Sequence, residues 1–562
     1  MNNKNSYKSI IELIIKIILI MICIVGISFT LIYIFYTSTA ILTSDSVITD
    51  VLAHHQLMDK QLLLTNWYYG NEFWIFSLSI PTFILSFFIK NNLLLRQVSV
   101  LITAVIFFYL LYQFGKRVLD RKSTFILIVI FLTGISYNIL DYFYAFNAYL
   151  TVCINSLFLL LLYYKMIKEK EDSRVYLFLS VLFTFLFNAT SLRYFPSVTF
   201  PFFIAGLIFL ITNSRQKKIK IFVKTNLKKI IKLNIVLISA ILGLSTFAVL
   251  TNVYNYEQRA GTIILKKEDK SKIDDKISAI FQCVNNFFGY DNKNNDITFM
   301  TGNQYFVKNK RNYPKISFFT FTNIIKVVMC IVCMIISPIV LFKNYKKNDS
   351  KLNFLLLFNI ISFFTMIILY IFSNSFFYNR SELKYYIFNM ILFIITGLYF
   401  SYNYVSKNRI LGYIVDSFII VYMISNLYTT YLTIRDNNKK VQKEKYELVN
   451  LLKSNNLDYG YGGCWNSLIS YFLSDYKITV APVVTSPDGV TPYKWYSDKR
   501  WYYNTKKHKG KIFLILDQKN VAYKDNIINY YGIPDDILQC KGYSVLIYNK
   551  NPFIEEFHRK IR

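Results

Sequence analysis

Long apolar stretches dominate the first three quarters of the chain, and short polar segments separate them. Eleven of these stretches are long enough to cross a bilayer at about 1.5 Å of rise per residue, so we expect each to form a membrane-spanning helix. They cover residues 11–36, 95–114, 124–140, 145–164, 175–190, 195–212, 230–250, 319–342, 352–373, 385–403 and 410–431.

Two of the apolar stretches need a separate interpretation. Residues 73–89 are short and contain Pro81, which favours a re-entrant or interfacial helix over a full crossing. The first stretch is too long for the core of a signal peptide and lacks an A-x-A cleavage site, so we expect an uncleaved membrane anchor.

The pattern changes after residue 432. Residues 439–454 have the periodicity of an amphipathic helix, and Tyr459–Gly463 predicts a glycine-rich turn. Three β-rich runs then predict strands over Lys477–Val484, Lys511–Asp517 and Tyr543–Tyr548.

The predicted fold class is therefore an all-α polytopic membrane domain of about eleven spans plus the short helix, followed by a small α/β domain. The membrane domain covers residues 1–431 and includes two long polar loops, 37–72 and 251–318. The α/β domain covers residues 432–562.

The composition of the chain agrees with a membrane protein, but its large positive net charge needs an explanation. Of 562 residues, 54% are hydrophobic and only 17% are charged, yet the net charge is +31. The densest basic segment, 213–229, carries seven cations and no acid on a short loop between two spans. Short Lys/Arg-rich loops stay cytoplasmic, so we expect a cytoplasmic N-terminus and an extracytoplasmic C-terminal domain in a multi-pass cell-membrane protein. Basic residues confined to such loops do not form a nucleic-acid surface, and no nucleic-acid partner is expected.

Two other features of the sequence favour structural roles. Asp416 lies well inside the last span, where an unpaired carboxylate is costly, so we expect it to be paired. Cys464 and Cys540 both fall in the predicted extracytoplasmic domain, where a disulfide between them is one option.

Ionisable residues gather at the start of the first outer loop. Asp45 follows the first span, and if 46–58 is helical, Asp50 and His54 lie on one face at i, i+4. A carboxylate near the outer membrane surface can accept a proton from an attacking hydroxyl. The alternative is that Asp45 caps this helix while Asp50 and His54 lie on its solvated face. A divalent metal on these side chains is conceivable but not supported, and no cofactor is required.

The layout resembles the GT-C superfamily of integral-membrane glycosyltransferases. An N-terminal anchor precedes a large outer loop with the early acidic Asp45, and this loop ends in the aromatic segment Trp67-Tyr68-Tyr69-Gly70. Many spans, a long middle loop and an extracytoplasmic α/β tail follow. Members of this superfamily use polyprenyl-phosphate sugars as donors, and the resemblance assigns the general base to Asp45 and places Trp67 near the substrate.

Cations at the outer ends of spans are exceptions to the charge rule. Arg193 and Tyr194 lie between two spans, and Arg380 and Lys384 precede a late one. Arg and Lys bind phosphate oxygens, but they also extend toward the membrane surface without a ligand, and both interpretations stay open. Family members often carry Arg-Tyr where this chain has Lys384-Tyr385.

Two further outer segments are candidate substrate contacts. Glu257 and Arg259 either line the same cavity or pair with each other. We expect most of the aromatic segment 493–503 to rest on the membrane surface, and Trp495 and Trp501 are the candidates for contact with sugar rings.

These residues predict a membrane glycosyltransferase. A lipid-linked sugar enters from the bilayer, Asp45 deprotonates an acceptor hydroxyl, and the outer cations stabilise the departing lipid phosphate. The expected partners are a polyprenyl-phosphate sugar donor, a glycan or lipid acceptor of the cell envelope, and the lipid bilayer. The alternatives are a transporter or flippase of lipid-linked saccharides, which needs no base, and a polymerase or ligase of envelope glycans.

Overall fold

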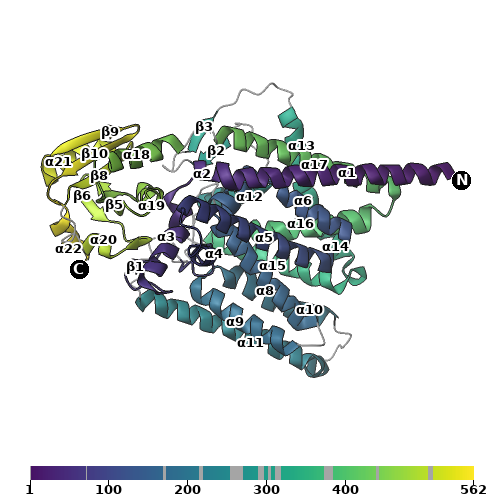
Figure 1. Cartoon of the computed structure of the whole chain (residues 1–562). Coiled ribbons are helices and arrows are strands. Elements are labelled where there is room, and N and C mark those ends of the chain that lie inside the picture. The colour runs from purple at the N-terminus through teal and green to yellow at the C-terminus, as the bar shows by residue number, and fades with distance from the viewer. Residues whose placement is uncertain are drawn as a thin grey trace.

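The structure is a computed structural model of the 562-residue chain. It describes residues 2–70, 72–168, 173–213, 219–253, 270–288, 297–300, 306–309, 318–372, 384–437, 442–503 and 510–561. A bundle of long helices forms one part, and a six-stranded sheet with flanking helices lies at the end of the bundle opposite the N-terminus (Figure 1). The predicted fold class is confirmed.

Long apolar helices make up the bundle. Among the described residues, nine helices are long and apolar enough to cross a membrane. The pair α6 and α7–η2, bent by 87°, is either one broken span or a re-entrant loop, and the apolar helix Arg174–Thr190 is shorter. These segments overlap the eleven predicted stretches, and the number of full crossings stays a prediction. The bundle helices are α1 (Asn2–Ile32), α5 (Asn92–Val118), α6 (Arg121–Leu132), α7 (Tyr137–Leu140), α8 (Ala148–Lys168), α9 (Ser173–Thr190), α10 (Phe200–Asn213), α11 (Ile219–Val253), α13 (Phe318–Ile331), α14 (Ser337–Lys343), α15 (Ser350–Phe372), α16 (Ile387–Phe400) and α17 (Arg409–Asn437).

In the part of the chain that the structure describes, five single-turn π-helical segments interrupt or extend these helices. Such turns add one residue per turn and reorient the side chains that follow. They are η1 (Tyr33–Thr37), η2 (Asp141–Ala145), η3 (Phe195–Thr199), η4 (Val332–Ile336) and η7 (Ser401–Val405).

Shorter elements lie between the spans. After η1, the helices α2 (Ser38–Ala40) and α3 (Ser44–Asp59) and the strand β1 (Trp67–Tyr68) make up the first outer loop. The predicted short helix 73–89 is α4 (Ser79–Leu85), whose seven residues are too few to cross a bilayer. The loop 251–318 contains α12 (Lys270–Phe287) and the hairpin β2 (Ile297–Met300) and β3 (Phe306–Asn309).

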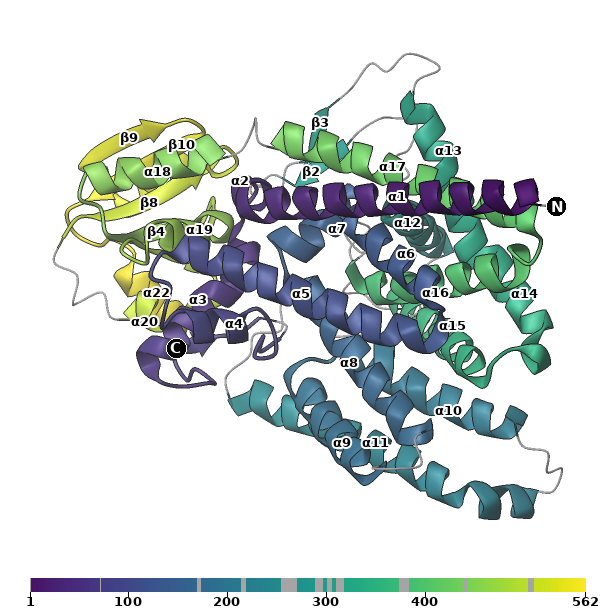
Figure 2. The ribbon, with the colours of Figure 1, turned by 45° about the vertical axis from the view of Figure 1, so that its right-hand side comes forward.

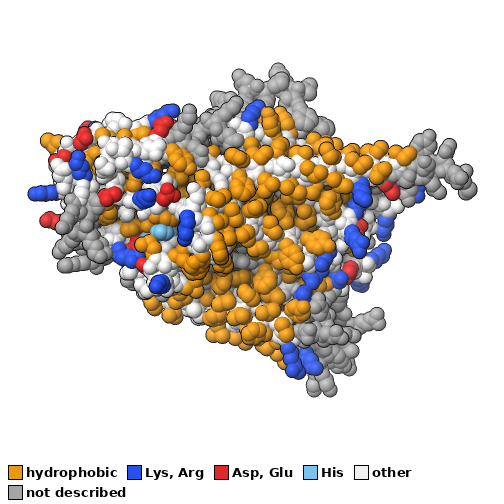
Figure 3. Space-filling model, viewed as in Figure 1, with side chains coloured by type: hydrophobic (Ala, Val, Ile, Leu, Met, Phe, Trp, Pro, Cys, Tyr) orange, Lys and Arg blue, Asp and Glu red, His pale blue; other side chains and the backbone are white. Residues whose placement is uncertain are grey.

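The surface of the bundle has the distribution of side chains expected in a bilayer. Apolar side chains cover the middle of the bundle, while Lys, Arg, Asp and Glu gather at its two ends (Figure 3). Exposed large apolar residues are frequent on α1, including Leu13, Ile17 and Met21. A soluble protein rarely exposes so broad an apolar band, so it marks the lipid-facing surface.

The C-terminal domain is built on a mixed sheet of order β6-β5-β4-β8-β10-β9. Strands β5 and β8 flank β4 in parallel, and the other pairs are antiparallel. The three predicted strands are confirmed as β5, β8 and β10, and the predicted helix as α18. The elements are α18 (Gln442–Ser454), β4 (Tyr459–Gly463), α19 (Cys464–Leu473), β5 (Thr479–Ser486), β6 (Gly489–Pro492), β7 (Ser497–Asp498), α20 (Arg500–Tyr503), β8 (Ile512–Asp517), α21 (Lys524–Tyr531), β9 (Asp536–Cys540), β10 (Tyr543–Tyr548) and α22 (Ile554–Ile561).

Alternating side chains of β8 give this sheet two buried faces. Phe513 and Ile515 pack with α18 on one face, whereas Leu514 packs with α19 and α22 on the other. A strand covered on both sides has a continuous apolar sequence, which Ile512–Asp517 has.

The glycine-rich segment Tyr459–Gly463 is a strand of the sheet, and its prediction as a turn is wrong. It is the strand β4, between β5 and β8. The ring of Phe513 on β8 covers Gly460 so closely that an added Cβ would overlap it. The aromatic ring of Phe513 thus supplies the packing that the glycine lacks. The local sequence does not predict this contact, because the ring belongs to another strand.

Candidate active site

Helix α3 lies at the end of the bundle that faces the C-terminal domain (Figure 2), and Asp45 belongs to its first turn. Thr43 caps this helix: its side chain accepts a hydrogen bond from the Ser46 amide, and the Ser46 hydroxyl accepts one from the Thr43 amide at 2.7 Å. Ser44 and Ser46 are buried on either side, while the Asp45 side chain is exposed. The cap therefore belongs to Thr43, which leaves Asp45 available for another role.

The surroundings of Asp45 tune its acidity. Desolvation by the surrounding protein raises the pKa of this carboxyl to about 6, although the side chain itself is accessible, and the positive charge of Lys384 opposes the rise. The positive end of the α3 dipole also favours the carboxylate form. Asp45 is thus ionised at neutral pH and is a stronger base than an ordinary aspartate.

Two cations from different spans share the same aromatic rings beside this carboxylate. Lys384, just before α16, places its Nζ 5.2 Å from the ring centre of Tyr385 and 5.7 Å from that of Tyr149. The guanidinium carbon of Arg193 lies 5.5 Å from each of the same two ring centres. The structure therefore brings Asp45, Lys384 and Arg193 to one region, although they are far apart in sequence.

Glu72 holds Arg193 in place. The two side chains form a buried ion pair, and Arg193 also lies 5.6 Å from the ring of Trp74. Burial raises the pKa of the Glu72 carboxyl, while the charge of Arg193 opposes this effect. Because Glu72 neutralises Arg193, Lys384 supplies the additional positive charge near Asp45.

The first outer loop is docked on the C-terminal domain. Strand β1 pairs antiparallel with β7, and Trp74 donates a hydrogen bond to the Tyr496 hydroxyl at 2.6 Å. Arg500 binds Asp59 through two hydrogen bonds of 2.9 and 2.8 Å. These contacts fix the end of the loop on which Asp45 and Glu72 lie.

Other predicted substrate contacts have protein partners in the structure. Asp50 is buried in an ion pair with Arg96, and the His54 ring stacks on Tyr476 with centres 3.7 Å apart. Trp67 is fully buried, and Asn155 donates a hydrogen bond to the hydroxyl of buried Tyr194 at 2.9 Å. A substrate role for these four residues stays a prediction. Glu257, Arg259 and Arg380 lie outside the described residues.

The aromatic segment 493–503 is largely internal, so the preference for a membrane-surface role is wrong for its buried members. Tyr496, Trp501 and Tyr502 lie in the core shared by the first outer loop and the C-terminal domain. Trp501 packs edge-on against Trp67 with centres 6.3 Å apart, and only Trp495 of the two candidate sugar contacts is partly exposed.

Two structural expectations have clear outcomes. Asp416 is paired as predicted: Lys122 donates to both its oxygens, at 2.7 and 2.6 Å, and the Tyr402 hydroxyl donates at 2.7 Å. Cys464 and Cys540 are not joined, so the option of a disulfide is not realised. Cys464 instead begins α19, where burial and then the negative charge of Asp45 raise the pKa of its thiol.

The described residues contain no group of three His, Cys, Asp or Glu side chains placed to hold a metal ion. The candidate site comprises the carboxylates Asp45 and Glu72 beside the cations Lys384 and Arg193 and several aromatic rings.

The sequence interpretation missed Glu72, Trp74, Tyr149 and Tyr385 as members of this site. Glu72 directly follows the aromatic segment of the first loop, and it is an acid at an outer span end opposite the cation Arg193. That charge complementarity was the available signal. Tyr149 carries no such signal, since Tyr is abundant, with 46 in the chain.

The fold is similar to that of the Archaeoglobus fulgidus oligosaccharyltransferase. Against the apo crystal structure the TM-score is 0.49 at 9% identity, covering 90% of this chain and 70% of that chain. Against the form tethered with an acceptor peptide containing the NVT sequon, the TM-score is 0.43 at 11% identity, covering 96% and 74%. No protein-family model and no curated protein matches the sequence. At these values, the function of the chain rests on its own residues.

Proposed function

We propose that this protein is a membrane glycosyltransferase that moves a sugar from a polyprenyl-phosphate donor to a hydroxyl of a cell-envelope glycan or lipid-linked acceptor. One observation carries the proposal. Asp45 is an accessible carboxylate with a pKa of about 6, and the cation Lys384 lies beside it at the end of a lipid-embedded bundle. A base with a pKa near the working pH suits removal of a hydroxyl proton.

The reaction requires one base and one cationic region. The acceptor oxygen bonds to the anomeric carbon while its proton passes to Asp45. The bond from that carbon to the phosphate oxygen breaks, and the phosphate departs with the electron pair. Lys384 and Arg193 stabilise the charge that develops on this leaving group, the contribution for which fixed cations are most effective.

The aromatic rings around these cations suit a sugar substrate. Tyr149, Tyr385 and Trp74 present flat faces within one small region, held by Arg193 and Lys384. Rings combine a large apolar face with a polar edge, a combination that fits a sugar ring. The apolar surface of the bundle would accommodate the polyprenyl chain (Figure 3).

A transporter of lipid-linked saccharides is the competing function. Transporters place ionisable residues along a pathway at the membrane midplane. Here the carboxylate inside the last span, Asp416, is bound by Lys122 and Tyr402. The accessible carboxylate and its cation lie instead at the end of the bundle, which favours chemistry at the membrane surface.

A donor panel tests the proposal. Purified protein in proteoliposomes is given labelled sugars on either polyprenyl phosphate or a nucleotide, together with envelope-lipid acceptors. We expect labelled product only with the polyprenyl donor. Equal use of nucleotide sugars, or movement of intact donor across the bilayer without bond cleavage, would contradict it.

A further inference from the structure

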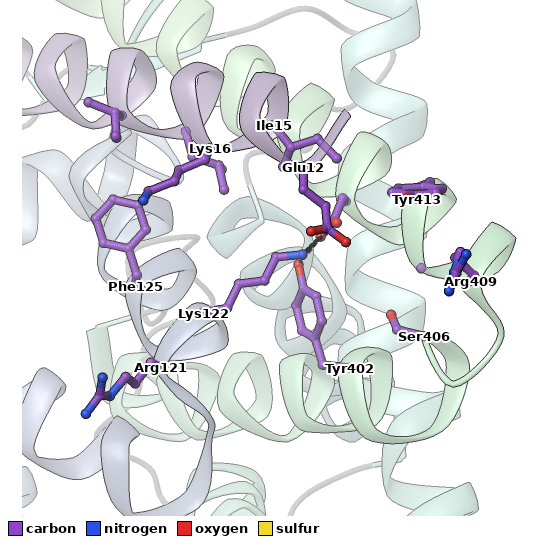
Figure 4. Close-up of a pocket in the computed structure, with 14 residues that line it drawn as sticks. Glu12, Ile15, Lys16, Arg121, Lys122, Phe125, Tyr402, Ser406, Arg409 and Tyr413 are labelled. Atoms are coloured by element: carbon purple, nitrogen blue, oxygen red, sulfur yellow. Dashed lines mark hydrogen bonds and ion pairs between the residues drawn. The ribbon is translucent and has the colours of Figure 1, made fainter. Parts of the chain in front are cut away.

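A cavity lies at the end of the bundle opposite the candidate active site. It has a volume of about 710 Å³ and opens between α1, α6, η7 and α17 (Figure 4). Its size is within the range of binding sites for small molecules. None of its lining residues belongs to the site around Asp45.

The floor of this cavity is a closed polar network. Lys122 is bound to Asp416, and Tyr402 donates to the same carboxylate. In Figure 4, Lys122, Tyr402 and Glu12 point toward one another at the centre of the cavity. This network satisfies the buried carboxylate and leaves the remaining cations of the cavity for another partner.

Lys16 and Arg409 are two of those three cations, and Arg121 is the third. Lys16 on α1 and Arg409 on α17 lie on opposite sides of the opening (Figure 4). Among the residues that the structure describes, neither forms an ion pair. With Arg121 and Lys122, the lining carries four cations against the two carboxylates Glu12 and Asp416. Its net charge of +2 therefore favours an anion.

The lining changes from polar to apolar along two of the helices. On α1, Lys16 is followed one turn deeper by Leu19 and Ile20, and on α6, Lys122 is followed by Phe125. A ligand that fits this gradient has an anionic head beside apolar chains. Basic pockets between membrane helices bind anionic lipid head groups in this way.

We propose that this cavity binds an anionic phospholipid. The phosphate lies between Lys16 and Arg409, within reach of the hydroxyls of Ser406 and Tyr413, and the acyl chains lie along Leu19, Ile20 and Phe125. The lipid thereby fastens α1 to α6 and α17, the two helices against which α1 packs. This role is independent of glycosyl transfer.

Native mass spectrometry of the delipidated full-length protein tests the proposal by titration with phosphatidylglycerol or phosphatidylcholine. We expect one molecule of phosphatidylglycerol to stay bound to the protein and phosphatidylcholine to bind clearly more weakly. Each cation raises the affinity for an anionic lipid about fivefold. The double variant Lys16→Gln with Arg409→Gln should therefore bind phosphatidylglycerol about 25-fold more weakly. The control Lys346→Gln with Lys347→Gln, on an exposed turn outside the cavity, leaves binding unchanged.

A second variant blocks the cavity without removing charge. Gly412 lines it, and the nearest atoms to a Cβ there belong to Ser406, at 3.6 Å or more, so a side chain can begin at this position and we expect Gly412→Trp to fill the space. Loss of phosphatidylglycerol in this variant, with unchanged elution in neutral detergent, supports the proposal. The proposal would be overturned if both lipids bind equally or if both variants bind phosphatidylglycerol as the wild type does. It would also be overturned if glycerol phosphate displaces phosphatidylglycerol at the same concentration as the lipid.

Discussion

At the scale of single residues, the environment of Asp45 decides what this carboxylate can do. Thr43 and Ser46 provide the helix cap, so Asp45 is not needed for that purpose. Desolvation weakens its acidity and Lys384 partly restores it. The result is a base whose strength depends on a cation more than 330 positions away, and both side chains are therefore open to test through the pH dependence of the reaction.

The pH profile of transfer reports this coupling. Because the base acts in its deprotonated form and its pKa is about 6, we expect kcat/KM to fall about tenfold per pH unit below pH 6. Lys384 lowers this pKa, so Lys384→Gln shifts the acid limb to higher pH and raises the KM for the donor. Lys384→Arg keeps the charge, so the acid side of its pH profile should stay at the wild-type position. An unchanged pH profile in Lys384→Gln would contradict the coupling between Lys384 and Asp45.

His54 is expected to make the protein sensitive to acid. Burial and the neighbouring His55 lower the pKa of its imidazole to about 4, below the ordinary 6.5. Between these values the unfolded chain binds more protons than the folded protein, so stability falls as pH falls from 6.5 to 4. His54→Phe keeps the stacking on Tyr476 and removes the titration. The thermal midpoint of this variant should therefore decline less over that window than the wild-type midpoint, and a parallel decline rules out His54 as the cause.

At the scale of elements, ion pairs and short strands join segments that are distant in sequence. Helix α3 is fixed to α5 through Asp50 and Arg96, and Arg96 also donates to the Ala145 carbonyl. The pairing of β1 with β7 fixes the other end of the first outer loop. These connections make the loop a rigid support for Asp45.

Removal of Arg96 tests this support. Arg96→Met leaves the buried carboxylate of Asp50 without its cation, a change that costs about 3–5 kcal/mol. We expect a large fall in the thermal midpoint of the purified protein, and partial recovery in the double variant with Asp50→Asn. Arg117→Met, a half-buried arginine at the other end of α5, is the matched control and should have a small effect. Equal effects of the two arginines would contradict the support role.

Local pattern predicted most elements but not the contacts between them. The apolar helices of the bundle and the strands β5, β8 and β10 follow from apolar runs that any neighbour would bury. Strand β4 was missed because Gly460 depends on Phe513 from another strand. Asp45, Arg193 and Lys384 were recognised as ionisable residues at span ends. Their convergence is set by tertiary packing that no local signal encodes, whereas the pairing of Arg193 with Glu72 had only the complementary charge at a span end as a signal.

At the scale of the whole molecule, the apolar band separates two charged ends. The C-terminal domain and the candidate active site lie at one end, and the N-terminus and the cavity between α1, α6 and α17 lie at the other (Figure 1). Which end faces the cytoplasm remains a prediction from the basic loops.

A reporter fusion determines this orientation. Alkaline phosphatase fused after Tyr548 is active only outside the cytoplasm, and we expect activity there because the short basic loops stay inside. A fusion within 213–229 should be inactive and serves as the control. If the loop fusion were active and the Tyr548 fusion inactive, the predicted orientation would be wrong, and both sites would lie on the opposite sides of the membrane.

The central claim is that Asp45 removes the proton of an acceptor hydroxyl during sugar transfer. The most direct measurement is transfer from a labelled polyprenyl-phosphate sugar by purified Asp45→Asn, with Asp525→Asn, an exposed acid in the first turn of α21, as the control. Loss of a general base typically costs about 10²–10⁴-fold in rate. We predict a loss of this size for Asp45→Asn with an unchanged thermal midpoint, and none for Asp525→Asn. Undiminished transfer by Asp45→Asn would contradict the account.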